Sequence, residues 1–367
     1  MLFRSDLHSL IKNIYVLCGG NSAEHEISLI SAKAVINNLD REKYDVYPVF
    51  IDKKGAFHYL GLQKETVEKP EDLIRTDEVS VQKSIIDFLQ KNYKVDEENL
   101  FIPVLHGTYG EDGTVQGFLE ILDVPYMGNN VLSSAICMDK AIANEILSYK
   151  NIAKSKFKVI YKSDFNHEKE KIKSEILNEF TLPVYVKPAN CGSSVGITHV
   201  ESEEDLMSGI SEAFLYDDKI LVEEEIIGDE LQVSVIGNDE PKASLPGGLI
   251  MERPFLDYNA KYVDGKLIPL VPYEMSDEDY RRVQELAEKT YKVLGCKGLA
   301  RVDIFLRRSD KKLFVNEINT FPGMTDLSMT PKLWKVTDGT TYPMLLEKLI
   351  NLALTMEIGR ASCRERV

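Results

Sequence analysis

Apolar runs of strand length and amphipathic helical stretches alternate along the first third of the chain. Three runs have the length and composition of strands: residues 14–18, 46–50 and 100–105. Helical spacing fills residues 28–39 and 115–122. Strand, helix and strand in this order imply parallel pairing with a right-handed crossover. The pattern predicts an open α/β sheet, and the loop 106–113 follows a strand at the edge where such sheets bind ligands.

The pattern changes in the middle of the chain. A helical stretch opens at residues 138–140. Later strands are predicted at residues 182–187, 220–224 and 231–236. An amphipathic helix runs from Ser276, a preferred N-cap residue, to a C-cap at Gly295. Residues 53–94 follow no clear pattern, and residues 246–275 resemble a long loop.

A hairpin is predicted near the C-terminal end, with strands at residues 299–306 and 313–319 and the polar run 307–312 at its tip. Side chains alternate along a strand, so polar groups two residues apart share a face. The polar residues concerned are Arg301, Asp303, Glu317 and Asn319. Carboxylate and amide oxygens are ligands that Mg²⁺ prefers, often together with nucleotide phosphates. The alternative is a solvated outer face of the hairpin.

Length and composition limit the class of protein. The chain has 367 residues, 44% of them apolar and 28% charged, which suits a soluble protein of two or three domains. A net charge of −15 argues against a nucleic-acid binder, although local lysines and helix N-termini still allow an anionic ligand. The five cysteines follow no metal-binding spacing, and neither a signal peptide nor a membrane span is evident. We therefore expect a cytoplasmic protein without a nucleic-acid or membrane partner.

Residues 357–367 break from the helical pattern of residues 342–356. Their sequence resembles a translated sequencing adapter, and a native basic tail is the alternative. We treat this segment as a non-native tail.

A glycine- and serine-rich loop at residues 192–196 follows a predicted strand. Such a loop can donate backbone N–H groups to phosphate oxygens, and Lys187 stands just before it. Lys140 is a second candidate phosphate cation. The alternatives are a simple turn and ordinary surface lysines.

Four carboxylates cluster after the strand that begins at residue 220: Glu223, Glu224, Glu225 and Glu230. A carboxylate in such a position can accept hydrogen bonds from ribose hydroxyls. The alternative is a solvated acidic connection, and it applies to some of the four.

These segments together resemble the D-alanine–D-alanine ligase family of the ATP-grasp superfamily, from about residue 14 to residue 353. Nine motifs occur in the family's order, at residues 19–29, 106–117, 125–128, 138–140, 186–188, 192–196, 257–262, 301–303 and 316–325 with Ser328. The resemblance implies a three-domain ATP-grasp fold with an N-terminal open parallel α/β domain. The implied parts are residues 1–128 for substrate binding, 129–226 as the central ATP-grasp domain, and 227–356 with the metal site and a mobile loop.

The resemblance also assigns roles to single residues. Asp303, Glu317 and Asn319 would bind two Mg²⁺ or Mn²⁺ ions. Nucleotide contacts would come from Lys140, Lys187, Ser194, Glu223, Glu230 and Lys261. Glu24 would hold the ammonium of the first D-alanine near His106, Ser193 would link Glu24 to Tyr262, and Ser328 would bind the second D-alanine. Arg301 and the backbone N–H of Gly323 would stabilise an oxyanion.

The activity that the resemblance implies is ATP-dependent joining of two D-alanines through an acyl phosphate, for peptidoglycan precursor synthesis, by a homodimer. The chain departs from the family pattern at Leu256, where a tyrosine is usual, whereas Lys261 and Tyr262 favour an amino acid as second substrate. Two alternatives stay open: a ligase that uses D-serine or another D-residue second, and a catalytically silent ATP-grasp regulator.

Overall fold

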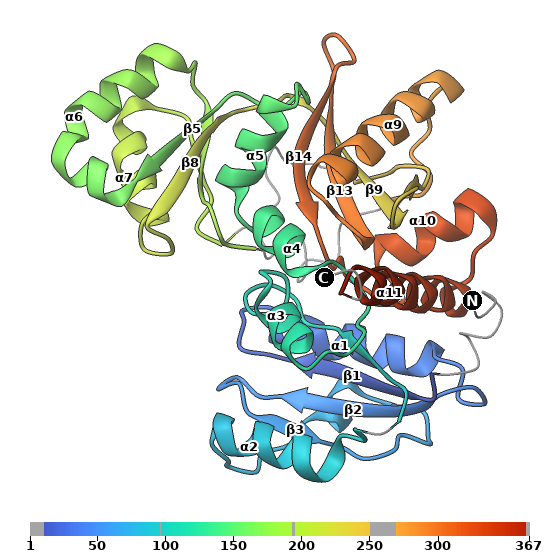
Figure 1. Cartoon of the computed structure of the whole chain (residues 1–367). Coiled ribbons are helices and arrows are strands. Elements are labelled where there is room, and N and C mark those ends of the chain that lie inside the picture. The colour runs from blue at the N-terminus through green and yellow to red at the C-terminus, as the bar shows by residue number, and fades with distance from the viewer. Residues whose placement is uncertain (1–10, 96, 193–194, 250–268, 365–367) are drawn as a thin grey trace.

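The computed structural model describes residues 11–95, 97–192, 195–249 and 269–364. Its strands form three sheets, and each sheet comes from a different stretch of the chain (Figure 1). In that view the first sheet lies below, and the other two lie above it. Within the described ranges, no helix combines the length and apolar character that a membrane crossing requires.

The first sheet is the predicted open α/β sheet. Its strands are β1 (Asn13–Gly19), β2 (Asp45–Ile51), β3 (Phe57–Tyr59) and β4 (Asn99–Pro103), in the order β3-β2-β1-β4. Strand β1 is parallel to β2 and β4, and β3 is antiparallel to β2. Its helices and short helical turns are α1 (His25–Asn38), η2 (Pro70–Leu73), α2 (Val81–Asp87), η3 (Phe88–Asn92) and α3 (Thr114–Ile121).

Helix α1 begins three residues before the predicted start at residue 28. The backbone N–H of Ser28 donates to the carbonyl of Glu24, so the first turn already contains the polar end of the motif 19–29. The prediction was wrong here because it began the helix at the apolar spacing. Because the helix begins at His25, Glu24 stands at its N-terminus.

The second sheet lies in the middle of the chain and is antiparallel. Its strands are β5 (Phe157–Tyr161), β6 (Val184–Pro188), β7 (Thr198–Val200) and β8 (Lys219–Glu224), in the order β5-β8-β6-β7. Helices α6 (Lys162–Glu179) and α7 (Glu203–Ala213) share a hydrophobic core with one face of this sheet. The predicted strands at residues 182–187 and 220–224 are confirmed.

The third sheet contains the predicted hairpin. Its strands are β9 (Gly228–Gly237), β10 (Lys242–Ala243), β11 (Gly247–Leu249), β12 (Pro269–Leu270), β13 (Gly298–Arg307) and β14 (Leu313–Asn319). The order is β12-β11-β9-β13-β14, with β10 beside β9. Helix α9 (Asp277–Val293) covers it, and Ser276 is its N-cap, because its side chain accepts from the backbone N–H of Asp279.

The long loop predicted at residues 246–275 needs correction at its two ends. Strands β11 and β12 pair there and extend the third sheet beyond β9. A Cβ on Gly247 would stand 2.8 Å from the Met329 sulfur, so Met329 packs closely against this strand, whose glycines sequence patterns associate with loops. Residues 250–268, the middle of the predicted loop, lie outside the described residues.

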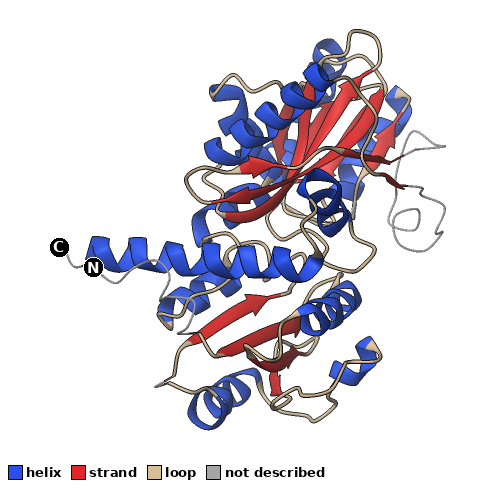
Figure 2. Ribbon diagram, turned by 90° about the vertical axis from the view of Figure 1, so that its right-hand side faces the viewer, coloured by secondary structure: helices blue, strands red, loops and turns tan. Residues whose placement is uncertain are grey.

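Four helices connect the sheets: α4 (Val131–Met138), α5 (Lys140–Tyr149), α10 (Met329–Asp338) and α11 (Tyr342–Arg364). Helix α11 lies lengthwise between the first sheet and the upper part of the molecule (Figure 2). Its Leu345 and Leu349 share one core with Ile14 of β1 and Val35 of α1. Its backbone helix continues eight residues past the predicted end at residue 356, with no proline to interrupt it, and the non-native origin of residues 357–367 stays a prediction.

Packing crosses the predicted domain boundaries. Cys137 of α4 and Leu147 of α5 belong to the core of the third sheet, together with Val302. Each sheet nevertheless lies within one of the three predicted parts of the chain. The boundaries at residues 128 and 226 remain predictions.

Candidate active site

Glu24 lies where loops of the first and second sheets meet. Its backbone N–H donates to Ser22 Oγ at 3.1 Å, and the Ser22 hydroxyl donates to the His106 carbonyl at 2.7 Å. A Cβ on Gly107 would stand 2.7 Å from Glu24 Oε2, and one on Gly192 would stand 3.0 Å from the same oxygen. Both loops therefore approach the Glu24 carboxylate through glycine, and the start of the glycine-rich loop lies beside it.

His106 connects the first sheet to the chain after β14. Its Nε2 is 2.9 Å from Ser31 Oγ, and its Nδ1 is 3.2 Å from the Phe321 carbonyl oxygen. Burial lowers the pKa of His106, although the nearby Glu24 carboxylate opposes this effect. A neutral ring that donates from Nδ1 to the carbonyl fits these contacts.

Glu111 also connects the loop after β4 to the chain after β14. The sequence analysis did not name it as a candidate site residue. Its Oε2 accepts from the backbone N–H of Gly107 at 2.8 Å, and its Oε1 accepts from that of Phe321 at 3.1 Å. Burial and the neighbouring Glu24 carboxylate raise the pKa of Glu111 to about 8. Its place in the motif 106–117 was the only available signal.

The predicted hairpin pairs as expected. Arg301 stands opposite Asn319, and Asp303 stands opposite Glu317. The register shifts after Asp303, where Asn316 is the extra residue of a bulge. The shift lets Val315 and Ile318 both enter the core, while the four polar side chains share the other face.

Asp303 is the buried centre of this polar face. Arg301 binds it through two hydrogen bonds, from Nε to Oδ1 and from Nη2 to Oδ2, each 2.7 Å long. Asn319 Nδ2 donates to Oδ2 at 3.2 Å. Paired, charge-assisted bonds of this geometry fix both partners, so the guanidinium has a defined position beside the metal-ligand candidates.

Lys140 joins the hairpin to the glycine-rich loop. It begins α5, where Asp139 is the N-cap and accepts from the backbone N–H groups of Ala141 and Ile142. The Lys140 ammonium donates to the Cys191 carbonyl at 2.6 Å and lies 3.9 Å from Glu317 Oε2. A cation predicted to bind phosphate therefore stands between the loop and a predicted metal ligand.

Glu223 is buried among nitrogen donors. Lys187 Nζ lies 2.6 Å from Oε2, and Asn144 Nδ2 and Lys154 Nζ lie 2.9 and 3.7 Å from Oε1. Burial opposes ionisation, but Lys187 and Lys154 outweigh it and lower the pKa of Glu223 to about 2. Two residues with predicted nucleotide contacts thus bind each other in this structure.

Lys154 was missed by the sequence interpretation. It follows α5 without any motif around it, and its contacts depend on how the second and third sheets meet. Burial lowers the pKa of Lys154 to about 8, an effect that Glu223 partly offsets.

Gly323 and Ser328 lie close together after β14. Ser328 is the N-cap of α10, and its Oγ accepts from the backbone N–H of Thr325 at 2.9 Å. A Cβ on Gly323 would stand 3.0 Å from this oxygen. The predicted oxyanion donor and the predicted carboxylate-binding hydroxyl therefore share one short loop.

Glu230 is buried on β9, opposite Phe305 of β13. Four predicted residues lie outside the described ranges: Ser193, Ser194, Lys261 and Tyr262. The departure at Leu256 lies outside them as well.

The hairpin side chains alone supply too few metal ligands for a divalent cation, so nucleotide phosphates and water would have to complete its coordination. Among the described residues, no group of three His, Cys, Asp or Glu side chains is arranged to hold a metal ion. Asp303 and Glu317 supply two carboxylates from opposite strands, and Asn319 adds an amide oxygen. Mg²⁺ commonly takes one or two carboxylates and completes its octahedron with phosphates and water, so this donor set suits a nucleotide-bound ion.

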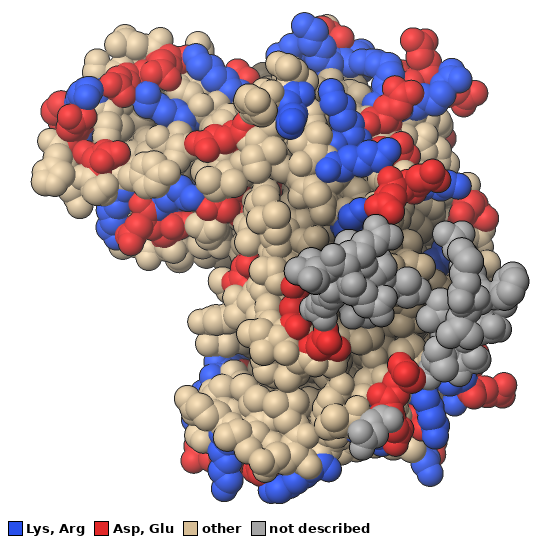
Figure 3. Space-filling view, viewed as in Figure 1, with Lys and Arg blue, Asp and Glu red and all other residues tan. Residues whose placement is uncertain are grey.

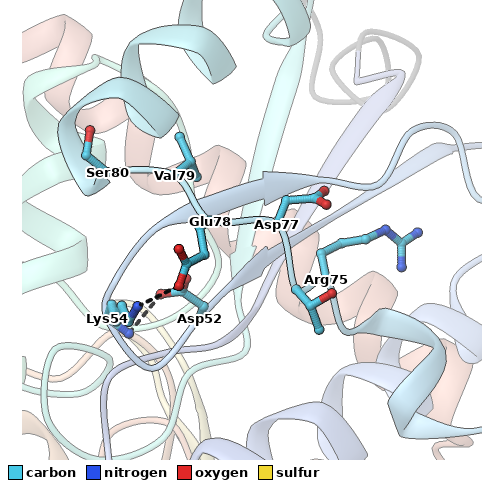
Figure 4. A pocket seen from close by; sticks show the side chains of 8 residues that line it. Asp52, Lys54, Arg75, Asp77, Glu78, Val79 and Ser80 are labelled. Carbon is cyan, nitrogen blue, oxygen red and sulfur yellow. Dashed lines mark hydrogen bonds and ion pairs between the residues drawn. The ribbon is translucent and has the colours of Figure 1, made fainter.

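A hollow on the first sheet's outer side lies apart from these residues (Figure 4). Its lining mixes both charges: Asp52, Lys54, Arg75, Asp77 and Glu78. Lys54 pairs with Glu78 at 3.7 Å, and none of the predicted site residues lines the hollow. Figure 3 shows acidic and basic side chains of the described residues interspersed in the upper and lower parts of the visible face, with a mostly uncharged middle.

Comparison with known proteins places the chain in a family. The family models described as D-ala D-ala ligase N-terminus and D-ala D-ala ligase C-terminus match residues 13–129 and 146–351. A D-alanine--D-alanine ligase of Finegoldia magna is 46% identical over 345 residues, which are 94% of this chain and 96% of the relative.

Two solved structures resemble the fold over almost the whole chain. The D-alanine-D-alanine ligase of Coxiella burnetii has a TM-score of 0.79 and 32% identity, with 97% of each chain covered. The VanG D-Ala:D-Ser ligase of Enterococcus faecalis has a TM-score of 0.78 and 34% identity, and the match covers 94% of this chain and 99% of that one. From its ordered motifs, its three sheets and these matches, the chain belongs to the D-alanine–D-alanine ligase family and has the ATP-grasp fold.

Proposed function

We propose that this chain joins two D-alanines into D-alanyl-D-alanine at the expense of ATP, releasing ADP and phosphate, as a step in peptidoglycan precursor synthesis. One observation carries the proposal: Lys140 binds the Cys191 carbonyl at 2.6 Å and lies 3.9 Å from Glu317. This contact links the chain just before the predicted phosphate-binding loop to a predicted metal ligand of the hairpin, which supports the proposal. Relatives that carry the ligase name support the substrate assignment.

The first half-reaction makes a carboxylate reactive. A carboxylate is a poor acyl donor, so an oxygen of the first D-alanine attacks the γ-phosphorus of ATP and gives an acyl phosphate and ADP. In phosphoryl transfer the protein contributes chiefly positioning and charge stabilisation. In this proposal Lys140 and Lys187 contact the phosphates, and Glu24 holds the substrate ammonium.

Asp303, Glu317 and Asn319 would hold Mg²⁺ or Mn²⁺ ions on the hairpin face. When bound, such ions neutralise charge on the phosphate oxygens during transfer. The three side chains come from facing strands, so their spacing is set by the sheet register and not by a loop.

In the second half-reaction the amine of the second D-alanine attacks the acyl carbon. The tetrahedral intermediate then breaks its C–O bond to phosphate, which leaves, and the nitrogen loses a proton. The developing oxyanion needs hydrogen-bond donors, and Arg301 and the Gly323 N–H are the candidates. Asp303 fixes the Arg301 guanidinium through two 2.7 Å bonds, so this donor needs little reorganisation during the reaction. Loss of one such donor typically costs about 3 kcal/mol of transition-state stabilisation.

A D-alanine–D-serine ligase is the second candidate, because one similar solved structure is the VanG D-Ala:D-Ser ligase. A silent regulator is disfavoured, because Arg301, Asp303, Glu317 and Asn319 are all present and share one face of the hairpin. We also propose a cytoplasmic homodimer, and its mass in solution by light scattering tests the subunit number.

The proposal is tested by measuring ADP release with each component omitted in turn. Turnover is expected to require ATP, D-alanine and Mg²⁺ together, and to stop when a chelator removes the metal. ADP release that continues at the same rate without D-alanine would rule the ligase proposal out.

A further inference from the structure

We propose that Lys154 is a positioning residue for the nucleotide: it balances the charge of Glu223 so that Lys187 can leave Glu223 and contact a phosphate. This inference rests on the proposed use of ATP and adds a residue to that site. It follows from the contacts around the buried Glu223 carboxylate.

Lys154 is attached to the hairpin by both its backbone and its side chain. Next to it, the backbone N–H of Val315 in β14 donates to the carbonyl of Ala153 at 2.9 Å. The Lys154 ammonium donates to the carbonyl of Asn316, the extra residue of the bulge. Glu317, the predicted metal ligand, is the next residue along the strand. Lys154 therefore spans from the hairpin of the third sheet to Glu223 of the second.

The two lysines around Glu223 differ in distance and exposure. Lys187 is the nearer partner at 2.6 Å, with 14% of its side chain exposed. Lys154 is 3.7 Å away, and only 3% of its side chain is exposed. Lys187 is thus partly open to solvent, whereas Lys154 is enclosed and held by the Asn316 carbonyl.

The charge balance explains why a second lysine is needed. If Lys187 turned toward a phosphate without replacement, Glu223 would be left as a buried carboxylate without a countercharge, which is strongly unfavourable. With Lys154 beside Oε1 and Asn144 donating to the same oxygen, the carboxylate keeps a positive partner and a hydrogen bond. Lys154 thereby lowers the free-energy cost of releasing Lys187.

A purely structural role for Lys154 makes a different prediction. In that case its replacement would lower stability and leave nucleotide affinity unchanged in the folded protein. In the present proposal, loss of the charge weakens nucleotide binding specifically, because Lys187 then stays on Glu223.

The test compares Lys154→Gln, which keeps a hydrogen-bond donor but no charge, with Lys154→Arg, which keeps the charge. Binding of Mg-bound ADP and of a non-hydrolysable ATP analogue is measured by titration calorimetry without D-alanine. Lys154→Gln is expected to weaken binding of the ATP analogue at least about tenfold, equivalent to about 1.4 kcal/mol. Lys154→Arg is expected to stay within about threefold of the unsubstituted chain, which is about 0.7 kcal/mol.

Lys156→Met is the matched control, because Lys156 lies two residues away and its ammonium donates to the Glu179 carbonyl, away from Glu223. In steady-state assays the KM for ATP should rise in Lys154→Gln, while the KM for D-alanine stays unchanged. Unchanged affinity in Lys154→Gln, or equal loss in Lys154→Arg, overturns the inference. If Lys154→Gln does not fold, Lys154→Met serves as the uncharged variant, and the same weakening of ATP-analogue binding is expected from it. A chain that binds no nucleotide in its unsubstituted form overturns the proposed function instead.

Discussion

Glu223 shows how a single buried charge depends on its neighbours. Its carboxylate is 3% exposed and is compensated by two lysines and an amide from other elements. The sequence analysis predicted Glu223 and Lys187 as separate nucleotide contacts, but it could not show that the two bind each other. Nor could it find Lys154, because the role of this lysine arises only where two sheets meet.

The acid stability of the protein should depend on Glu223. Its folded pKa of about 2 lies below its ordinary 4.5, so its stabilisation is complete above pH 4.5 and is lost as the pH falls toward 2. Glu223→Gln should lower the free energy of unfolding at pH 7 by roughly 3 kcal/mol, because two buried lysines lose their countercharge. Urea unfolding at pH 7 and at pH 3 measures the free energy of unfolding of both proteins. The deficit of Glu223→Gln relative to the unsubstituted chain should be smaller at pH 3.

The exposed Glu42 provides the control, and Glu42→Gln should change neither value. A Glu223→Gln deficit that is the same at both pH values would contradict the assignment of the acid-labile stability to this carboxylate.

Glu317 should matter for turnover and little for folding. Its side chain is partly exposed on the polar face of the hairpin, so Glu317→Gln is expected to leave the unfolding midpoint within a degree or so of the unsubstituted chain, as for most surface changes. ADP release should fall at least about a hundredfold, the loss expected when phosphate charge is no longer neutralised. Asp310→Asn at the hairpin tip is the control, and equal turnover in Glu317→Gln would remove this residue from the metal site.

At the scale of single elements, most of the fold was predictable from the sequence. The strands β1, β2, β4 and β8, helix α9 and the hairpin of β13 and β14 all lie close to their predicted positions, because each is a long periodic or strongly apolar segment. Strands β11 and β12 were missed, because they are very short and Gly247 and Gly248 resemble loop residues. The early start of α1 was missed, because its first turn is polar.

The N-cap of α9 should contribute measurably to the free energy of unfolding of the protein. Ser276 accepts from the backbone N–H of Asp279 at 3.1 Å, so Ser276→Ala should lower the free energy of unfolding by about 1 kcal/mol. Ser80 is a matched control, because it stands at the N-cap of α2 without a capping hydrogen bond. Urea unfolding of both variants should show a loss for Ser276→Ala only, and equal losses would argue against the cap.

At the scale of the whole molecule, the end of the chain completes the core of its beginning. Leu345, Leu346 and Leu349 of α11 share one core with Ile14 of β1 and Val35 of α1. Asn129 ties the parts together from another side, since its Nδ2 donates to the Thr320 carbonyl at 2.8 Å. Such contacts between distant segments are not visible in local sequence patterns, and they hold the Glu24 region near the hairpin.

Leu349→Ala should therefore destabilise the first sheet together with α11. Leu349 is 1% exposed, and replacing a buried leucine by alanine typically costs 2–5 kcal/mol, so we expect roughly 3 kcal/mol here. Trp334, the one tryptophan of the chain, lies in the same core and reports unfolding by fluorescence. Met344 of the same helix is 51% exposed, so Met344→Ala should lower the free energy of unfolding much less. Equal losses in the two variants would contradict the shared core.

The proposed ligase site combines loops of the first and second sheets with the hairpin of the third sheet. The most direct measurement is to supply ATP, Mg²⁺, D-alanine and D-serine together and to identify the dipeptides by mass spectrometry while counting the ADP released. We expect D-alanyl-D-alanine as the main product, with one ADP for each dipeptide. D-alanyl-D-serine as the main product would reassign the second substrate, and ADP release without any dipeptide would contradict the ligase account.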